Sequence, residues 1–452
     1  MSAIKRKAIS SSLMLLFTAG IGLPAKTTLA SLVCKQPGFA EPVGLAATGT
    51  VPIAVAPGDF DLDGKPDLAV ANQTSNTVGL LFGDGAGEFA ALDPGLGVSN
   101  PVAVTVGNFD DSTEDDASNP DPNNAPDVAV MSGDSTLSLF FSHGNRAFSS
   151  RIIGNLDNMA GGNIAGGMAQ GDFNGDGHLD LAVTVAPNTL LPSDRQLQGV
   201  MILSGNGLKV FTPSFYRTDF VPLQFVASRS IGVGDFNQDG RPDLAIAGTD
   251  AAQQALGILF NDGQGGFNAQ KINFNWIEAV TVNDFNGDGY PDVAVAGHDY
   301  QGTSEASVSI LLNNQNQTFA RSDISVAAWR SAPFTIISAD FNFDHNPDLV
   351  VGGTEVTDPY AGNLTVLLGD GTGKFGDIAS VRAGLKAYSL AVGDFNGDGQ
   401  ADVVETDRSS QVTLLPGGGA VGFRLSDNFS VGRSGSNAAD ETPQSCFYRI
   451  HD

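Results

Sequence analysis

Oxygen-bearing side chains recur at a fixed spacing in the stretch DFNGDGYPD, which begins at Asp284. Asp284, Asn286 and Asp288 alternate over five positions, Gly289 follows at position six, and Asp292 stands at position nine. A sharp turn brings the side chains at positions one, three and five together, and glycine permits the positive φ that this turn requires. Oxygen ligands without nitrogen or sulfur suit Ca²⁺, which binds them at about 2.3–2.6 Å. The spacing therefore predicts a calcium-binding loop.

The same pattern occurs six times, each time directly before an apolar run. We therefore expect up to six Ca²⁺ ions, with these side-chain ligands: Asp59, Asp61, Asp63 and Asp67; Asp172, Asn174, Asp176 and Asp180; Asp235, Asn237, Asp239 and Asp243; Asp284, Asn286, Asp288 and Asp292; Asp340, Asn342, Asp344 and Asp348; Asp394, Asn396, Asp398 and Asp402. Loop 340–348 has His345 where glycine is expected, which predicts a strained turn. A degenerate seventh copy begins at Asn108 and retains Asp110 and Asp127, and we assign no ion to it.

The EF-hand shares the opening of this loop and is the rival interpretation. An EF-hand needs a bidentate Glu at position twelve and a helix on each side. Position twelve is Val or Ile in five of the loops and Glu405 in the last, and the flanking residues alternate as in strands. We therefore reject the EF-hand. The remaining alternative is an acidic turn held by Asx-type hydrogen bonds without metal, which leaves like charges close together.

Each loop lies within a longer unit that predicts four β-strands. The loops begin at residues 59, 108, 172, 235, 284, 340 and 394. An apolar run precedes the loop and another follows it; a third run, a glycine-rich turn, an aromatic residue and a more polar stretch complete the unit. One four-stranded sheet cannot bury both of its faces, whereas sheets arranged radially can. The predicted fold is all-β, a seven-bladed β-propeller of four-stranded antiparallel blades with calcium-binding loops.

These units resemble the FG-GAP repeats, also called VCBS repeats, of the integrin α-subunit N-terminal β-propeller. The resemblance covers roughly residues 38–432 and rests on the acidic loops and on the phenylalanine after glycine in GEF, GGF and GKF. It implies calcium in the loops between first and second strands on one face, and ligand binding on the opposite face. Adhesion proteins, lectins and enzyme accessory domains share this fold, so the resemblance leaves the function open.

The N-terminus predicts export. Residues 1–30 join a basic cluster to an apolar stretch that is shorter than the roughly 20 residues of a membrane span. This layout is typical of a secretory signal peptide, with cleavage after Ala30, and it makes 31–452 the mature propeller with short terminal extensions. We expect a secreted protein (periplasmic, cell-surface or extracellular) with no membrane span after cleavage.

The two ends of the propeller also carry a prediction about ring closure. Segments GFAEPVGLAATG, near the N-terminus, and GFRLSDNFSVG, near the C-terminus, both read as outer strands, so either one closes the ring. Cys34 and Cys446 flank these segments, and in an oxidising compartment we expect a disulfide between them. Two free thiols are the alternative.

The charge and the missing motifs narrow the partners. With 50 acidic and 23 basic residues the formal charge is −27, which excludes nucleic acid as a partner because no basic patch is available for phosphates. The chain has no G-x-S-x-G, H-E-x-x-H or phosphate-loop motif. On the face opposite the loops, the candidate ligand-binding residues are Trp276, His298, Tyr300, Trp329, Arg330 and Tyr360.

Aromatic side chains beside an arginine suit sugar rings or protein surfaces, although packing of both tryptophans into the core is an equal alternative. We therefore expect an exported, monomeric, calcium-binding propeller that acts as a binding or adhesion module for a glycan or an extracellular protein. The alternatives are an extracellular carbohydrate-active enzyme, a lyase or hydrolase, on the same scaffold, and a purely structural role.

Overall fold

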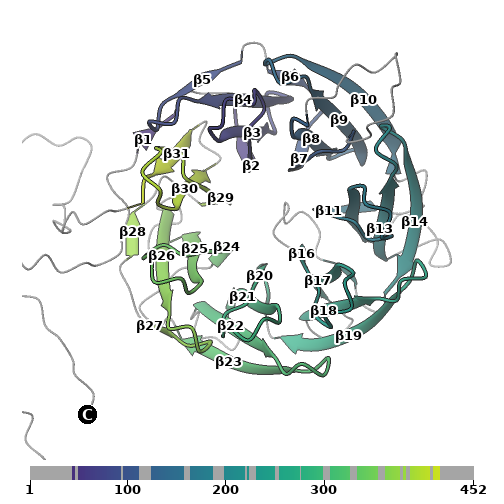
Figure 1. Cartoon of the computed structure of the whole chain (residues 1–452), viewed down its shortest axis with the longest axis vertical. Helices are drawn as coiled ribbons and strands as arrows, with labels where there is room; N and C mark the ends of the chain where they lie inside the picture. The colour runs from purple at the N-terminus through teal and green to yellow at the C-terminus, as the bar shows by residue number, and fades with distance from the viewer. Residues whose placement is uncertain are drawn as a thin grey trace, which may run out of the picture. The chain divides into compact units, whose positions relative to one another are not determined.

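In the computed structural model, the described residues form seven β-sheets arranged as the blades of a ring (Figure 1). The described residues are 43–45, 49–92, 95–110, 124–156, 163–186, 198–218, 221–222, 231–249, 254–274, 276–298, 306–325, 333–354, 362–376, 380–382, 387–407 and 411–417. No helical element occurs among them. The predicted all-β, seven-bladed propeller is confirmed.

Each blade begins with an inner strand and runs outward through antiparallel neighbours. The first three blades consist of β2 (Pro52–Gly58), β3 (Asp67–Asn72), β4 (Thr77–Gly83), β5 (Phe89–Ala91) and β6 (Leu96–Gly97); β7 (Pro101–Gly107), β8 (Asp127–Ser132), β9 (Thr136–Ser142) and β10 (Phe148–Asn155); and β11 (Asn163–Gly171), β12 (Asp180–Ala186), β13 (Gly199–Gly205) and β14 (Phe211–Arg217). The fourth and fifth consist of β15 (Val221–Pro222), β16 (Ile231–Gly234), β17 (Asp243–Thr249), β18 (Gln254–Asn261) and β19 (Phe267–Phe274); and β20 (Ala279–Asn283), β21 (Asp292–His298), β22 (Ala306–Asn313) and β23 (Phe319–Ser325). The sixth consists of β24 (Pro333–Ala339), β25 (Asp348–Thr354), β26 (Gly362–Gly369), β27 (Phe375–Gly376) and β28 (Ser380–Arg382).

The seventh blade combines both ends of the propeller. Its strands are β29 (Ser389–Gly393), β30 (Asp402–Thr406), β31 (Val412–Leu415) and, outermost, the N-terminal β1 (Val43–Gly44). Val43 lies opposite Leu414, and the amide of Leu45 donates to the carbonyl of Val412 at 2.9 Å. Of the two predicted outer segments, the N-terminal one therefore closes the ring. The segment 422–432, Cys34 and Cys446 lie outside the described residues, so the disulfide stays a prediction.

Burial follows the order of the strands within a blade. The second strand is buried throughout, as in β3 and β8, because blades pack against both of its faces. The outer strands are largely exposed, as in β19. Among the described residues, seven buried apolar clusters each join two neighbouring blades. This is the expected behaviour of radially stacked sheets, which bury their faces only against one another.

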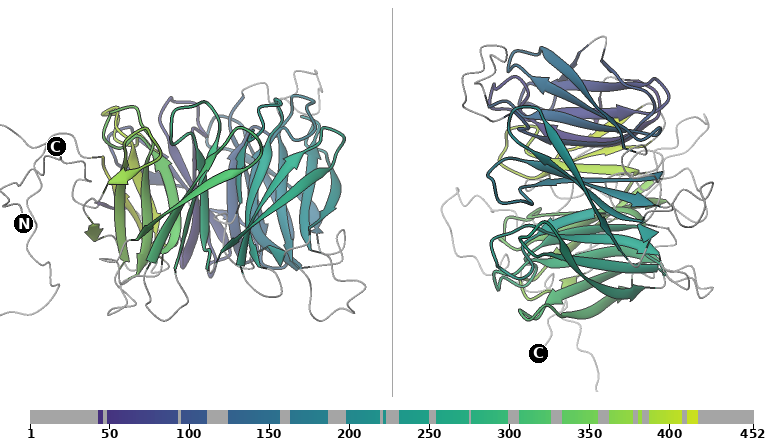
Figure 2. Two further views of the ribbon diagram at one scale, coloured as in Figure 1. Left: turned by 90° about the horizontal axis from the view of Figure 1, so that it is seen from below. Right: turned by 90° about the vertical axis from the view of Figure 1, so that its right-hand side faces the viewer.

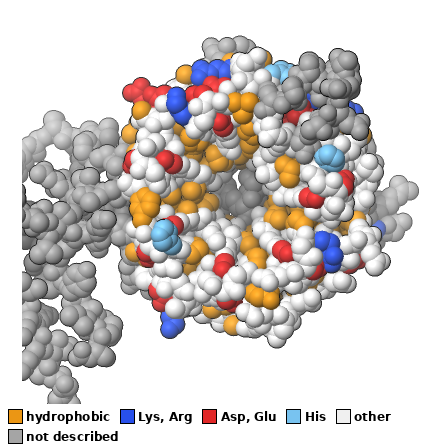
Figure 3. Space-filling model, viewed as in Figure 1, with side chains coloured by type: hydrophobic (Ala, Val, Ile, Leu, Met, Phe, Trp, Pro, Cys, Tyr) orange, Lys and Arg blue, Asp and Glu red, His pale blue; other side chains and the backbone are white. Residues whose placement is uncertain are grey.

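The inner strands of all seven blades line a central cavity of about 360 Å³. Its wall is mixed, with Val104 and Leu390 beside polar residues such as Thr281 and Ser389. Figure 3 shows apolar side chains around the central opening of one face and acidic side chains spaced around the ring.

Phenylalanine pairs connect the blades. The residue at loop position two packs against the aromatic residue that begins the outer strand of the next blade; Phe285, for example, lies 5.5 Å from Phe375, ring centre to ring centre, in an edge-to-face arrangement. The other pairs are Phe60–Phe148, Phe109–Phe211, Phe173–Phe267, Phe236–Phe319 and Phe395–Phe89. In these six pairs, the phenylalanine at the start of the outer strand, which includes the one after glycine in GEF, GGF and GKF, therefore contributes to the contact between blades.

The acidic loops join first to second strands, and the glycine-rich turns join third to fourth strands. Because neighbouring strands are antiparallel, both kinds of connection lie at the same end of the strands and therefore on the same face of the ring. The views from the side show the strands running between the two faces of the ring (Figure 2). In the described part of the chain, no helix is long and apolar enough to cross a membrane.

Candidate metal centre

The six complete loops share one conformation, in which the first carboxylate gathers backbone amides. Asp284 Oδ1 accepts from the amides of Gly287 at 2.8 Å and Asp288 at 3.2 Å, and its Oδ2 accepts from Gly289 at 2.7 Å. Position one also accepts from the amide at position six in the other five loops, at 2.8 or 2.9 Å. Positions three and five face each other in the loop, where Asn286 Nδ2 lies 3.2 Å from Asp288 Oδ2. The oxygens at positions one, three and five are thus held by the loop itself.

Two positions of the loop have left-handed backbone. Position six has φ between 82° and 90° in the five loops with glycine, and His345 has φ 68°. The strain predicted for loop 340–348 is confirmed, because an L side chain in this region is disfavoured by about 1–2 kcal/mol. Position four is left-handed too, with φ 71° at Gly287 and φ 61° at Phe343. The spacing of the ligands did not predict this second left-handed residue, although three of the loops have glycine at position four.

The ninth residue of each loop connects the loop to the third strand. Asp292 is fully buried; its Oδ2 accepts from the amide of Phe285 at 2.9 Å and its Oδ1 from that of Asn313 at 2.7 Å. The same pair of amide bonds is made by Asp67, Asp127, Asp180, Asp243, Asp348 and Asp402. Position nine was predicted as a metal ligand, and in addition it holds the backbone of its blade together.

Burial raises the pKa of the ninth residue in the six complete loops. For Asp67 the pKa rises to about 7: desolvation is the main cause, the charges of Asp61 and Asp59 add to it, and the amides of Gly83 and Phe60 oppose it. Desolvation likewise raises the pKa to about 7 in Asp243 and to about 6 in Asp180, Asp292, Asp348 and Asp402. Each site therefore concentrates more negative charge than its surroundings favour.

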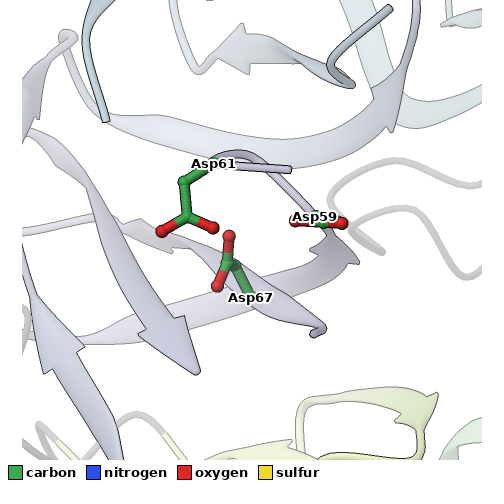
Figure 4. Close-up of side chains that lie close together, drawn as sticks. All are labelled: Asp59, Asp61 and Asp67. Carbon is green, nitrogen blue, oxygen red and sulfur yellow. The ribbon is translucent and has the colours of Figure 1, made fainter. Parts of the chain in front are cut away.

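Loop 59–67 has the most compact carboxylate group. One oxygen each of Asp59, Asp61 and Asp67 lies within 4.8 Å of the others. Asp61 and Asp67 point toward one another, with Asp59 to one side (Figure 4). Asp61 Oδ1 is buried and has no hydrogen-bond partner in the described part of the chain. A buried carboxylate oxygen without a donor, among further carboxylates, fits a hard cation such as Ca²⁺.

The degenerate loop of the second blade differs in its contacts. Asn108, at position one, donates from Nδ2 to Asn124 Oδ1 at 2.7 Å. Asp110, at position three, lies 3.1 Å from the ammonium of Lys209, which belongs to the third blade. Residues 111–123 lie outside the described part, so the absence of an ion here stays a prediction.

The predicted ligand-binding residues are only partly described. Trp276 is half-buried before β20, and its indole N–H donates to the carboxylate of Glu278. His298 ends β21. The side chain of His298 lies outside the described residues, as do Tyr300, Trp329, Arg330 and Tyr360. A shared binding surface for these six stays a prediction.

Blades built from one repeated unit, with an acidic loop after each inner strand, define a repeat-built β-propeller. A model of the FG-GAP-like repeat matches residues 121–183, 235–295, 284–351 and 356–405, and a model of the FG-GAP repeat matches residues 51–90. The first model alone matches more than half of the chain, so the chain belongs to the FG-GAP-like repeat family.

Solved structures show the same fold at low sequence identity. The crystal structure of BBS1N in complex with ARL6DN, soaked with lead, has a TM-score of 0.53 and 13% identity, covering 84% of this chain and 97% of that chain. The complex soaked with mercury has a TM-score of 0.52 at the same identity and coverage. No curated protein matches the chain.

Proposed function

We propose that this protein is an exported calcium-binding β-propeller that serves as a binding module, with a protein as its ligand. The calcium part rests on loop 59–67, where, among the described residues, no donor reaches the buried Asp61 Oδ1 beside Asp59 and Asp67. In each loop, the side chains at positions one, three, five and nine would hold the ion. Bound calcium would supply two positive charges to each carboxylate group and join the loop to its blade.

The binding part rests on the family and on the faces of the ring. In the solved complexes a related propeller, BBS1N, binds a protein, ARL6DN. The loops occupy one face of this chain, which leaves the second-to-third and fourth-to-first connections of the opposite face for a ligand. Trp276 lies in such a connection, between β19 and β20. A half-buried tryptophan is a frequent anchor in protein interfaces.

A matched pair of variants tests the calcium part. Asp288→Asn removes the charge of one predicted ligand. It keeps a side-chain oxygen that can accept the hydrogen bond which the Tyr290 amide donates to Asp288 Oδ1 at 2.9 Å. Glu88→Gln makes the same charge change at an exposed turn residue on the same face. We expect calcium to raise the melting temperature of the wild type and of Glu88→Gln equally, and that of Asp288→Asn by less. Equal rises in all three proteins contradict the proposal.

Binding is tested with purified protein on arrays of extracellular proteins and of glycans, in calcium and in EDTA. We expect calcium-dependent binding to proteins that Trp276→Ala weakens, while Ile152→Ala, a change at an exposed outer-strand residue, leaves it intact. Binding to glycans alone would identify the other ligand class, and new double bonds in a polyuronate substrate would show a lyase instead. Export is tested by the N-terminal sequence of the native protein, which should begin at Ser31.

A further inference from the structure

The turns between third and fourth strands hold a left-handed residue two positions before the aromatic residue of the outer strand. In three described turns it is glycine, with φ 85° at Gly87, 86° at Gly265 and 78° at Gly373. In the other three it carries a long side chain, with φ 66° at Arg146, 63° at Lys209 and 62° at Gln317. A long side chain at a position that favours glycine indicates that the side chain has a role.

In three of these six turns, the residue lies beside position three of the acidic loop in the preceding blade. A Cβ atom on Gly87 would stand 3.7 Å from the Cβ of Asn396, which is position three in the seventh blade. Arg146 Nε donates to Asp61 Oδ2 at 2.7 Å. Lys209 Nζ lies 3.1 Å from Asp110 Oδ2. The turn of one blade therefore reaches into the loop of its neighbour.

The two positions vary together along the described part of the chain. Position three is Asp in the two loops that face Arg146 and Lys209. It is Asn in the loops whose next blade carries glycine or Gln317 at the equivalent turn position; by this repeat equivalence the pairs are Asn174 with Gly265, Asn237 with Gln317, Asn286 with Gly373 and Asn396 with Gly87. Among the six described turns, a cation thus occurs only where the neighbouring loop has Asp in place of Asn at position three.

Burial of both partners distinguishes the Lys209–Asp110 pair from ordinary surface ion pairs. The side chains of Lys209 and Asp110 are 15% and 5% exposed, and the ammonium lies 4.5 Å from the ring centre of Phe141. In the Arg146–Asp61 pair only the carboxylate is buried: the Asp61 side chain is 9% exposed and the Arg146 side chain 47%. By contrast, Lys65 and Asp63 pair at 42% and 32% exposure. A buried carboxylate needs its partner, whereas an exposed pair contributes little.

We propose that Lys209 and Arg146 are built-in countercations on the face of the ring that carries the acidic loops. Each occurs where position three of the neighbouring loop is Asp. Lys209 takes the place of a metal ion at Asp110, so the second blade does not depend on calcium. Arg146 offsets the fourth carboxylate of loop 59–67 and sets the calcium affinity of that loop. The part for Arg146 rests on the proposed function, and the part for Lys209 holds in metal-free protein.

The Lys209 part is tested by urea unfolding in EDTA with Lys209→Met, Asp110→Asn and the double variant. Methionine keeps a chain over Phe141 without the charge. We expect each single change to raise the unfolding equilibrium constant by at least roughly 10-fold, and the double variant to regain part of that loss. Arg321→Met with Asp323→Asn is the control, an ion pair outside the acidic loops whose side chains are 36% and 56% exposed, and its effect is expected within about 2-fold. Equal effects in the two pairs would overturn the proposal.

The Arg146 part is tested by hydrogen exchange of the peptide that spans residues 59–67 at increasing calcium. Arg146→Met removes a positive charge beside the loop, so we expect the calcium midpoint of this peptide to fall roughly 10-fold. Asp61→Asn should raise the midpoint, and both variants should leave the midpoint of peptide 284–292 unchanged. A higher or unchanged midpoint in Arg146→Met overturns this part. Protection of neither peptide by calcium would refute the proposed function while leaving the Lys209 result valid.

Discussion

A substitution at the ninth residue of a loop best distinguishes a role in holding the backbone from a role in binding metal. Asp292→Ala removes the acceptor of two buried amides, those of Phe285 and Asn313. Each buried amide without an acceptor destabilises the folded state by about 1–3 kcal/mol, so two such amides destabilise it by about 2–6 kcal/mol. Removing a carboxylate whose charged form is desolvated offsets part of this loss. We therefore expect the free energy of unfolding to fall by about 2–4 kcal/mol.

Urea unfolding of Asp292→Ala and Asp288→Ala, each in EDTA and in calcium, measures the difference. Asp288 is exposed, and its backbone partner is the amide of Tyr290, so in EDTA its loss should lower the free energy of unfolding by less than about 1 kcal/mol. In calcium it should lose stabilisation that the ion supplies. Asp292→Ala should be destabilised under both conditions. If the two variants are equally stable in EDTA, the assignment of Asp292 as a backbone connector is wrong.

Three further predictions concern pH, strain and the contacts between blades. In EDTA, the aspartates with a raised pKa keep their protons in the folded state at pH values above 3.8, where the unfolded state has lost them. The free energy of unfolding should therefore fall as the pH rises from about 4 through 6 to 7. Melting curves at pH 4.5 and 7.5 check this, and a higher melting temperature at pH 7.5 contradicts it. His345→Gly should raise the free energy of unfolding by about 0.5–1 kcal/mol, because the relief of left-handed strain exceeds the conformational entropy that glycine loses on folding. Gly289→Ala should lower the free energy of unfolding. Changes of the opposite sign, measured by urea unfolding, refute the strain. Phe285 is 1% exposed and packs against Phe375. Phe285→Ala should therefore lower the free energy of unfolding by about 3–5 kcal/mol in urea titrations, with or without calcium. An effect below about 1 kcal/mol would show that the pair is not part of the core.

The acidic loops and the strands around them were predictable from the sequence because both are local patterns. The apolar run after Asp292 and the turn at Gly289 need no knowledge of distant segments. Ring closure was not decidable in this way, since two segments carried the same outer-strand pattern. The pairing of Val43 with Leu414 depends on how the whole ring closes.

Contacts between blades were beyond the sequence for a similar reason. Arg146 and Asp61 are separated by 85 positions, and only the packing of the second blade on the first brings them together. The backbone role of Asp292 was not predicted: its spacing identifies a carboxylate at position nine but not the two amides that donate to it. Alignment of the glycine-rich turns, beside that of the loops, would have revealed the cations at 146 and 209.

The central claim is that divalent ions neutralise the carboxylates of six equivalent loops. Its most direct measurement is elemental analysis of the purified protein before dialysis, followed by calcium titration of the chelator-treated protein. We predict up to six calcium ions per chain, lost in EDTA and restored on titration. A protein that contains no calcium and takes up none contradicts the account.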